Sequence, residues 1–522
     1  MKLPVAAVVA LFVSTLPAQE PVDLEMVAKI REEGLQRSRV IEAYNQFVNV
    51  IGPRLTASPA YNEAARWTRD KLTEWGVEDV HLESFEFGRG WTVERVSMEM
   101  TAPRYLPLIG YPRGWSPSTK GKLTGTPILT AGKTAEELTG KLEGAILLTR
   151  PVQTNFIRVD RDTPTHDTAE VVAAQAAART GQGRQQGQRR RGGQRGGQRG
   201  TQRQRGGQRG RGGQRGGRGA RSRTVGNAMF LEEGAGVLLE PSRGEHGTLF
   251  VTGRDSGDDV VPRVVLIAEH YNTLARLLEQ GVPVELNVDV QTRYHEEDTN
   301  GYNIIGEIPG VDPQIGDEVV MVGAHLDSWH SSPGATDNAD GSAVAMEAMR
   351  ILKAVGVQPR RTIRIGIWSG EEQGLHGSRH YVEDHLTGDD KQEARDKFSV
   401  YFNLDPGYGP INGWFLEGNT AMYPIMQAYS APFADLGADT LTMRGIGSTD
   451  HLNFIAQGLP GFQAIHNYAD YDVRTHHTNM DTYDRLEEDD LKQAAVVMAS
   501  ILYHAAMRDE KMPRAPRVGR VP

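Results

Sequence analysis

The sequence predicts an α/β fold, with a mostly parallel central sheet covered by helices on both faces and an inserted β-rich module. After about residue 300, strands that read as almost unbroken apolar runs alternate with helical stretches, as in "EVVMVGA" and "RTIRIGIWSG". Such strands are typical of parallel sheets that are buried on both faces. Between about 119 and 295 the pattern changes to short strands and glycine turns, as in "GKLTGTPIL" and "GTLFVTG". This change indicates the separate module.

The first residues have the pattern of an export signal. Lys2 precedes the apolar run 3–16, and "LPA" offers a cleavage site after Ala18, so we expect residues 1–18 to be a signal peptide. The alternative is an N-terminal membrane anchor, but the apolar run is too short to span a bilayer. No later segment has the roughly 18 consecutive apolar residues of a membrane span. We therefore expect no stable membrane insertion and an exported, periplasmic or secreted protein.

The sequence contains no cysteine. This excludes disulfides, thiolate metal sites and a cysteine nucleophile. An exported protein of this length without disulfides must rely on its core, and on any bound metal, for its stability.

Residues 19–118 form the N-terminal part of the predicted main domain, with helices first and strands after them. In the last of these helices, Ser58 is a plausible N-cap, Pro59 suits the first turn, and Gly76 follows the last apolar residue. The next segment, "VHLESFEF", predicts a strand, and further strands and turns follow it. The helical patterns cover about 23–36, 38–50 and 58–75.

The inserted module, 119–295, contains a low-complexity run. Residues 181–223 consist mostly of glycine, arginine and glutamine, with 14 arginines and no acidic or aromatic residue, in a chain whose net charge is −9. Such a run buries too little apolar area to offset its ordering entropy, so we expect a disordered surface loop. The alternative is an arm that binds nucleic acid or another polyanion. The predicted export and the missing aromatics argue against it, so we expect no specific nucleic-acid partner.

Residues 296–508 form the main part of the predicted domain. Apolar strands such as "EVVMVGA" alternate with helices such as "GSAVAMEAMRILKAVGV", and "DDLKQAAVVMASILYHAAMRDE" predicts a last apolar helix. We expect residues 509–522 to be a flexible tail.

Three predicted strands in this part end in side chains that can bind metal ions. "EVVMVGA" is followed by His325 and Asp327, "RTIRIGIWSG" ends at Glu371 and Glu372, and "FSVYFN" is followed by Asp405. In open α/β sheets, ligands bind beyond the carboxyl ends of the strands. Each residue alone has an ordinary explanation as a loop end, a helix cap or a helix first turn. Together the carboxylates would repel one another without a cation, so their coincidence indicates a pair of divalent ions.

Five motifs occur in order between about 300 and 508: "HLDS…GATDNADGSA", "WSGEEQGLHGS", "NLDPGYG", "GSTDHLNF" and "HHTNMDTYD". They resemble the dizinc exopeptidase family, which includes bacterial leucyl aminopeptidases and plasma glutamate carboxypeptidase. The opening "IGPRLTASPAYNEAARWTRDKLTEWG" is also similar to that family. The β-rich module resembles the protease-associated domain that many members carry at this position, although the arginine-glycine run departs from its usual pattern.

The resemblance implies a zinc-peptidase fold with two Zn²⁺ per chain. His325 and Asp405 would hold one zinc ion, and Glu372 and His477 would hold the other. Asp337 would bridge the two ions, which leaves room for a shared water. Imidazole and carboxylate ligands with an open position suit a catalytic zinc site.

The resemblance also implies two residues that act without binding metal. Glu371 would be the general base, and Asp327 would orient His325. The late ligand would be His477 and not His476, because His477 begins "HTNMDT". Independently of the resemblance, two metal ions can activate a shared water, and a neighbouring carboxylate can take its proton.

Other polar residues receive weaker interpretations. Tyr468 or Tyr471 could hydrogen-bond the reaction intermediate, although packing of their loop explains them equally well. Asp450 and His451 could line the substrate pocket, although a pair that stabilises the loop is the simpler reading. Two further histidines are expected in the pocket wall: His330 and His376.

The sequence therefore predicts an exported dizinc metallo-exopeptidase that hydrolyses terminal bonds of short peptides, with aminopeptidase activity favoured over carboxypeptidase or dipeptidase activity. One alternative is a glutaminyl-cyclase-like zinc acyltransferase, which would use a single zinc ion. The other is a non-catalytic polyanion-binding protein that uses the run 181–223. The intact ligand set favours the peptidase.

Overall fold

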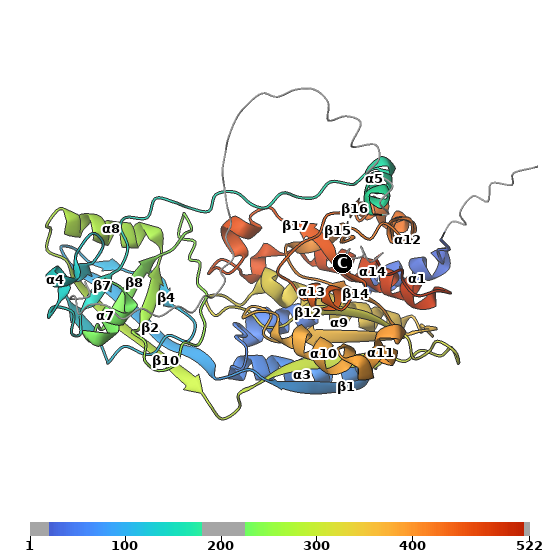
Figure 1. Cartoon of the computed structure of the whole chain (residues 1–522), viewed down its shortest axis with the longest axis horizontal. Coiled ribbons are helices and arrows are strands. Elements are labelled where there is room, and N and C mark those ends of the chain that lie inside the picture. Colours follow the sequence, from blue (N-terminus) through green and yellow to red (C-terminus); the bar gives the residue numbers. More distant parts are fainter. Residues whose placement is uncertain (1–19, 180–224, 516–522) are drawn as a thin grey trace, which may run out of the picture.

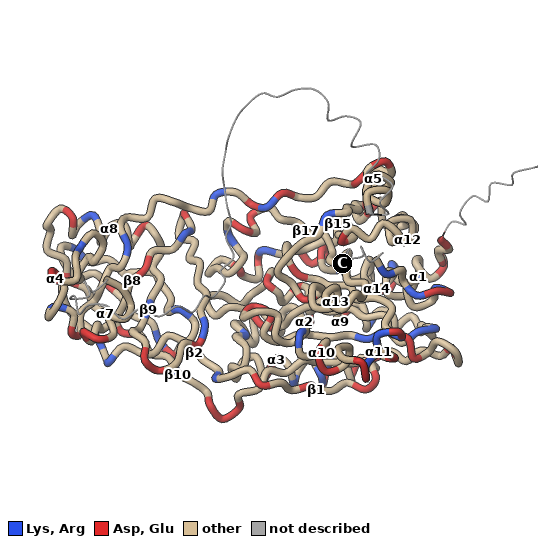
Figure 2. The backbone as a smooth tube through the Cα atoms, in the orientation of Figure 1, with Lys and Arg blue, Asp and Glu red and all other residues tan. Residues whose placement is uncertain are grey.

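The computed structural model describes residues 20–179 and 225–515. The predicted signal peptide 1–18, the run 181–223 and the last seven residues of the predicted tail lie outside the described residues. The described chain forms a body around a large sheet and a smaller module beside it (Figure 1). The charged residues lie mostly on the loops and outer helices, and the central strands of the body carry few of them (Figure 2).

The body contains an eight-stranded sheet in the order β1-β11-β13-β12-β14-β17-β15-β16. The neighbours β13, β12, β14 and β17 run parallel to one another, and antiparallel pairs flank this parallel centre. This arrangement confirms the predicted mostly parallel sheet. The strands are β1 (Glu78–Glu86), β11 (Asn300–Ile308), β12 (Val319–His325), β13 (Thr362–Trp368), β14 (Phe398–Asn403), β15 (Tyr408–Phe415), β16 (Thr440–Thr442) and β17 (Gly461–Asn467).

Helices cover both faces of this sheet because its strands present apolar side chains to both sides. In β12, Val320 and Val322 belong to the larger core, and Val319 and Met321 belong to a second core on the other face. The larger core includes α1 (Leu24–Gln36), α2 (Val40–Asn45), α3 (Pro59–Glu74), α9 (Asp340–Ala354), α12 (Tyr423–Ser430) and α14 (Glu488–Met507). The second includes α10 (His376–Leu386), α11 (Gln392–Lys397) and α13 (His451–Ala456). Two-sided burial explains the almost unbroken apolar runs of these strands.

The predicted helix at 58–75 corresponds to α3. The Ser58 hydroxyl accepts a hydrogen bond from the Tyr61 N–H, and Pro59 is the first helical residue. The Ser58 hydroxyl thus satisfies one of the orphan donors at the helix start and Pro59 removes another, as the sequence pattern predicts. Short 3₁₀ and π-helical segments complete the body: η1 (Gln46–Ile51), η3 (Ala335–Ala339), η4 (Asp389–Lys391), η5 (Ala431–Leu436), η6 (Tyr471–Thr475) and η7 (Tyr483–Arg485).

The module holds two sheets. An antiparallel sheet has the order β3-β2-β10-β5, and a second sheet has the order β4-β9-β8-β7-β6, in which β6 to β9 run parallel. The strands are β2 (Gly90–Ala102), β3 (Leu106–Pro107), β4 (Gly110–Pro112), β5 (Leu123–Gly125), β6 (Ile128–Leu129), β7 (Ile146–Leu148), β8 (Val237–Pro241), β9 (Arg263–Leu266) and β10 (Glu285–His295). Its helices are α4 (Ala135–Leu138), α7 (Asn227–Glu232) and α8 (Ala268–Glu279).

The strand pairing moves the predicted start of the module at 119, whereas β10 ends at His295, the predicted end of the module. The long strand β2 pairs with β10 along its whole length, so the module begins at Gly90. Conversely, α5 (Ala169–Arg179) lies on the body beside α12 and β16, and its Val172 belongs to the core of the body (Figure 1). The sequence does not predict either change, because the polarity pattern of a strand or helix does not show which element it packs against.

The beginning of the predicted flexible tail is held in place, which corrects that prediction. Met512 is 2% exposed, and its N–H donates to the Ser399 hydroxyl at 3.0 Å. Lys511 pairs with Glu318 at 2.6 Å, and the Pro513 carbonyl accepts a hydrogen bond from Asn419. A single apolar side chain near the end of a polar segment is a weak sequence signal, so this anchoring is visible only in the structure.

Among the described residues, no helix is both long enough and apolar enough to cross a membrane.

His330 lies where the module meets the body. Its imidazole packs against Trp91 with ring centroids 4.9 Å apart, and its Nε2 donates to the Pro112 carbonyl at 2.7 Å. Burial lowers the pKa of His330 to about 4. His330 was predicted to lie in the wall of the pocket. In the structure it lies at the junction of the module and the body.

We expect His330 to weaken the fold as pH falls. The unfolded imidazole takes up a proton near its ordinary pKa of about 6.5, but the folded one does so only near 4, so the unfolded state binds more protons between these values. Stability should fall by up to roughly 3 kcal/mol across this window. Urea unfolding at several pH values should show a shallower decline for His330→Gln than for the natural chain. Parallel curves for the two proteins would contradict this assignment.

Candidate metal centre

The carboxyl ends of the central strands bring the predicted site residues together. His325 ends β12, Glu371 and Glu372 follow β13, and Asp405 follows β14. Because β12 lies between β13 and β14 in parallel register, these ends meet at one edge of the sheet. Two further residues of the site do not follow a strand of the parallel centre. Asp337 lies in η3, just before α9, and His477 lies in the loop after η6.

One group of ligand atoms surrounds the His325 imidazole. Its Nε2 lies 3.3 Å from Asp337 Oδ1, 3.5 Å from Asp405 Oδ1 and 3.9 Å from Glu371 Oε2. The side chain of His325 is fully buried. His325, Glu371 and Asp405 also form a group whose atoms all lie close enough to hold one metal ion.

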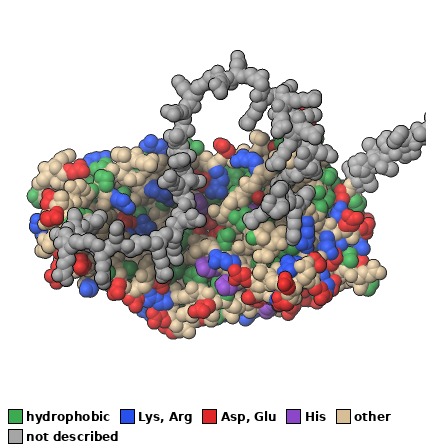
Figure 3. Space-filling model, in the orientation of Figure 1, with side chains coloured by type: hydrophobic (Ala, Val, Ile, Leu, Met, Phe, Trp, Pro, Cys, Tyr) green, Lys and Arg blue, Asp and Glu red, His purple; other side chains and the backbone are tan. Residues whose placement is uncertain are grey.

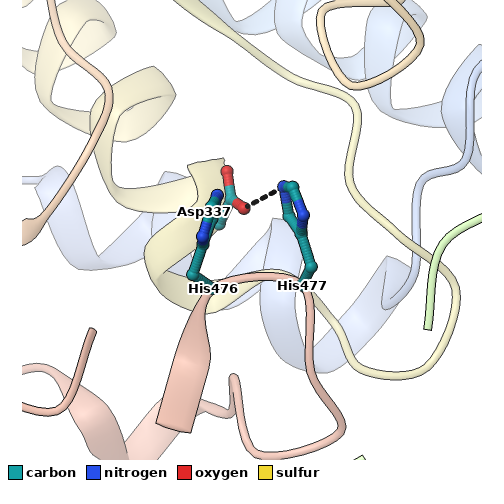
Figure 4. Close-up of side chains that lie close together, drawn as sticks. All are labelled: Asp337, His476 and His477. Carbon is teal, nitrogen blue, oxygen red and sulfur yellow. Dashed lines mark ion pairs between the residues drawn. The ribbon is translucent and has the colours of Figure 1, made fainter. Parts of the chain in front are cut away.

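A second group surrounds the His477 imidazole. Its Nε2 lies 2.8 Å from Glu372 Oε2 and 3.4 Å from Asp337 Oδ2. Figure 4 shows the Asp337 carboxylate between the two neighbouring histidines, with the ion pair to His477. Asp337 thus presents one oxygen to His325 and the other to His477, which is the arrangement of a bridging ligand.

The donor atoms of these groups fit divalent cations. His325 Nε2, Asp337 Oδ2 and Glu372 Oε1 are buried and have no hydrogen-bond partner within the described residues. Buried polar atoms without partners are rare in folded proteins and need an explanation, such as an absent ion. Nitrogen and oxygen donors of this kind suit zinc.

The electrostatics of the site support the same conclusion. Burial raises the pKa values of Glu371 and Glu372, and neighbouring carboxylates raise them further. Burial lowers the pKa of His477, which favours the neutral imidazole that binds metals. Burial alone would raise the pKa of Asp337, but contact with His325 and the nearby histidines outweighs it and lowers the pKa. A cation would replace the protons that these crowded acids otherwise retain.

Asp327, predicted to orient His325, contacts that imidazole and also the loop of the two glutamates. The Nδ1 of His325 contacts the backbone carbonyl of Asp327 at 2.9 Å, whereas the Asp327 carboxylate lies 3.6 Å away. That carboxylate instead accepts the backbone N–H groups of Glu371 at 3.2 Å and Glu372 at 3.3 Å. Asp327 therefore fixes the loop that carries the two glutamates and orients His325 through its main chain.

Two positioning residues escaped the sequence analysis. Arg54 is fully buried, and its guanidinium donates to the carbonyls of Leu326, Pro333 and Gly334, which flank the approach to Asp337. Nothing in "GPRLTAS" signals this role, because these three partners are main-chain atoms more than 270 residues away in the sequence.

Asp481 is the second of these positioning residues. Its carboxylate accepts the backbone N–H groups of Thr336 at 2.7 Å and Asp337 at 3.1 Å. Burial raises the pKa of Asp481 to about 7. Its place in "HTNMDT", four residues after His477, was the available signal.

The structure separates the weaker candidates. His476 stacks on Tyr471 with ring centroids 5.0 Å apart, and burial lowers its pKa to about 4. It also lies near Asp337, but the shorter contacts of this loop with the acids belong to His477. The Tyr468 hydroxyl is buried without a hydrogen-bond partner among the described residues.

The remaining candidates have structural partners. Asp450 accepts a hydrogen bond from the Ser378 hydroxyl, and His451 Nε2 lies 3.2 Å from Glu417. These contacts match the simpler reading of a pair that stabilises its loop. His376 begins α10 and packs edge-on against an aromatic ring, that of Phe87.

The module holds the loop that carries His477. The backbone N–H of Val251 donates to the His477 carbonyl at 3.1 Å, and Phe250 pairs with Thr478 in an antiparallel bridge. His477 itself adopts φ +61°, a left-handed conformation that non-glycine residues rarely adopt. The module therefore contacts the main chain of His477 and of its neighbour Thr478.

Comparisons with known proteins agree with this site. Residues 303–502 match the model described as "Peptidase family M28". Carboxypeptidase Q of Mus musculus is 28% identical over 51% of this chain and 54% of that protein, so the chain spans about half the length of this curated relative. Residues 303–502, which match the family model, contain all five predicted metal ligands.

Two solved structures share the fold across almost the whole chain. A peptidase M28 precursor from Shewanella amazonensis has a TM-score of 0.64 at 21% identity and covers 94% of this chain and 98% of its own. The structure of BSAP, a zinc aminopeptidase from Bacillus subtilis, has a TM-score of 0.55 at 20% identity and covers 91% and 96%. The predicted resemblance and the predicted α/β fold are confirmed.

We expect removal of metal to loosen the protein. A chelator should lower its melting temperature by several °C and added zinc should restore it, because an ion that binds only the folded state stabilises it. Asp337→Asn should reduce this response, since it weakens the ligand shared by both groups. Differential scanning fluorimetry measures the shift, with the exposed Asp384→Asn as the matched control. An equal zinc response in both variants would place the bound ion elsewhere.

Proposed function

Because residues 303–502 match peptidase family M28, we propose that the chain is a zinc-dependent exopeptidase that hydrolyses a terminal bond of short peptides. The observation that carries the proposal is the Asp337 carboxylate, whose two oxygens face His325 and His477 on opposite sides. Trimming from the amino end is the direction that we favour, and trimming from the carboxyl end is the alternative.

The residues present would hold two zinc ions. His325 and Asp405 would bind one, Glu372 and His477 the other, and Asp337 both. When bound, such a pair lowers the pKa of a water and polarises the carbonyl of the peptide bond. The unpartnered buried atoms of His325, Asp337 and Glu372 support this assignment.

Glu371 is proposed as the general base. Its Oε2 is the most distant of the three carboxylate oxygens around His325 Nε2, which leaves Glu371 the most available of these acids for a proton. Burial raises the pKa of its carboxyl group, so a proton taken from the attacking water can be retained and then delivered to the leaving amine. The loop hydrogen bonds to Asp327 hold Glu371 in place during this transfer.

Tyr468 is proposed to donate a hydrogen bond to the developing oxyanion. Its hydroxyl is buried and unpartnered among the described residues, and burial raises its pKa, which keeps the hydroxyl protonated. A donor that is already oriented and free of other bonds stabilises developing charge effectively.

Export and the nature of the module are also proposed. Lys2, the apolar run 3–16 and the cleavage site after Ala18 support an exported protein. The insertion of the module between β1 and β11, two strands of the main sheet, supports its likeness to a protease-associated domain.

Glu371→Gln is expected to abolish most of the turnover while metal binding persists. The isosteric amide cannot accept the proton, so kcat should fall by about 10²–10⁴. Elemental analysis should still find two zinc ions per chain, whereas one ion would favour the acyltransferase alternative. Glu383→Gln, on the exposed side of α10, is the matched control. Full activity of Glu371→Gln would refute the mechanism.

The direction of trimming can be read from blocked peptides. An aminopeptidase should cleave free and C-amidated peptides from the amino end and leave N-acetylated ones intact, because an acetyl group removes the terminal amine that it recognises. Mass spectrometry of the products distinguishes the two ends. Cleavage of the free and N-acetylated peptides, with the C-amidated ones left intact, would reverse the favoured direction.

A further inference from the structure

A cavity of 520 Å³ lies between the module and the metal centre. The wall on the module side comes from the segments around Arg150 and Arg243, and His477 contributes from the body. Figure 3 shows a hollow in the middle of this face, between the two parts of the molecule, with histidine and basic side chains around it. The same histidine therefore borders both the metal centre and the cavity.

The cavity carries uncompensated positive charge. Its Arg113 is paired with Glu240 at 2.7 Å, and Glu240 also lies 3.4 Å from Arg263. Arg150 and Arg243 are exposed and have no acidic partner within the described residues. Two guanidinium groups are thus free to bind an anion from solution.

The backbone of the Arg150 wall is rigidly held. The Tyr271 hydroxyl accepts the Arg150 N–H at 2.7 Å and donates to the Arg150 carbonyl at 2.6 Å. Asn272 makes the same double contact with the backbone of Gln153. Both anchoring side chains belong to α8 and are largely buried, so this wall is part of the folded module.

The Arg243 wall is held by Ser242. The buried Ser242 hydroxyl accepts the N–H groups of Gly244 and Phe250 and donates to the Thr248 carbonyl. The Arg243 guanidinium lies 5.7 Å from the centroid of the Phe250 ring. Phe250 pairs directly with Thr478, the neighbour of His477, so this wall is continuous with the metal centre.

We propose that this cavity is a subsite that binds a carboxylate of the peptide substrate through Arg150 and Arg243. Guanidinium groups bind carboxylates through paired hydrogen bonds, which makes them selective for this group over a neutral amide. The carboxylate can be the C-terminus of a short peptide or an acidic side chain. The proposal rests on the proposed peptidase function and adds the substrate class: short peptides with a carboxylate near the cleaved bond.

Four dipeptides test the subsite: Leu-Glu and Leu-Gln, each with a free or an amidated C-terminus. For the natural chain we expect a carboxylate to raise kcat/KM over its isosteric amide. Arg150→Gln/Arg243→Gln should lower the kcat/KM of the favoured carboxylate substrates by about tenfold to a hundredfold, mostly through KM, and bring the carboxylate-to-amide ratio towards one. If kcat/KM falls for the two peptides that have a free C-terminus, the subsite binds the terminal carboxylate. If it falls for the two peptides that contain glutamate, the subsite binds the side chain.

Two matched variants control for folding and for total charge. Arg150→Lys/Arg243→Lys keeps the charge and should retain part of the selectivity. Arg254→Gln removes an exposed module arginine outside this cavity and should leave the ratio intact. An unchanged ratio in the double glutamine variant, or an equal loss in Arg254→Gln, would overturn the subsite.

Binding without turnover separates this proposal from the peptidase proposal. Calorimetry measures the Kd of Leu-Glu for the Glu371→Gln protein. When Arg150 and Arg243 are also replaced by glutamine, this Kd should rise by the same factor by which kcat/KM falls. If the natural chain cleaves no peptide but this difference persists, the peptidase function fails and the carboxylate site stands. If peptides are cleaved and the difference is absent, only the subsite fails.

Discussion

The site depends on how a folded protein can bury several carboxylates at one point. Glu371, Glu372, Asp337 and Asp405 are close enough to repel one another, and burial strengthens this repulsion because the surroundings screen charge poorly. Asp337 resolves part of the conflict by facing an imidazole with each of its oxygens. Divalent cations would offset the remaining repulsion between the carboxylates. The free energy of metal binding therefore contributes directly to the free energy of assembling the site.

The scaffold around this point supplies rigidity mainly through main-chain contacts. Arg54 donates to the carbonyls that precede Asp337, Asp481 accepts the N–H groups of the same segment, and Asp327 holds the loop of the two glutamates. None of these three contacts requires the metal. The ligands are therefore arranged in advance by residues that do not bind it, and less ordering remains to be done when an ion arrives.

The module contributes to the site although it supplies no metal ligand. It contacts the main chain around His477 and forms the basic wall of the adjacent cavity. The metal groups of the body are rich in carboxylates, and this wall carries free guanidinium groups. A substrate that spans both would meet metal ligands at one end and guanidinium groups at the other, and this difference favours one orientation of a short peptide over the reverse.

The sequence by itself determined the strands, the main helices and the list of ligand types. Two-sided burial forces apolar runs such as those of β12 and β13, and the chemistry of His325, Glu372 and Asp405 follows directly after such runs. The tertiary structure alone decided the partners: that β2 belongs with β10, that Met512 is anchored, and that the carbonyl of Asp327 contacts His325. It also decided the role of Arg54 and the pairing of Phe250 with Thr478 in the His477 loop. These are contacts between main-chain atoms or between segments distant in sequence, and a main-chain atom has the same chemistry in every residue, so no pattern of side chains can announce them.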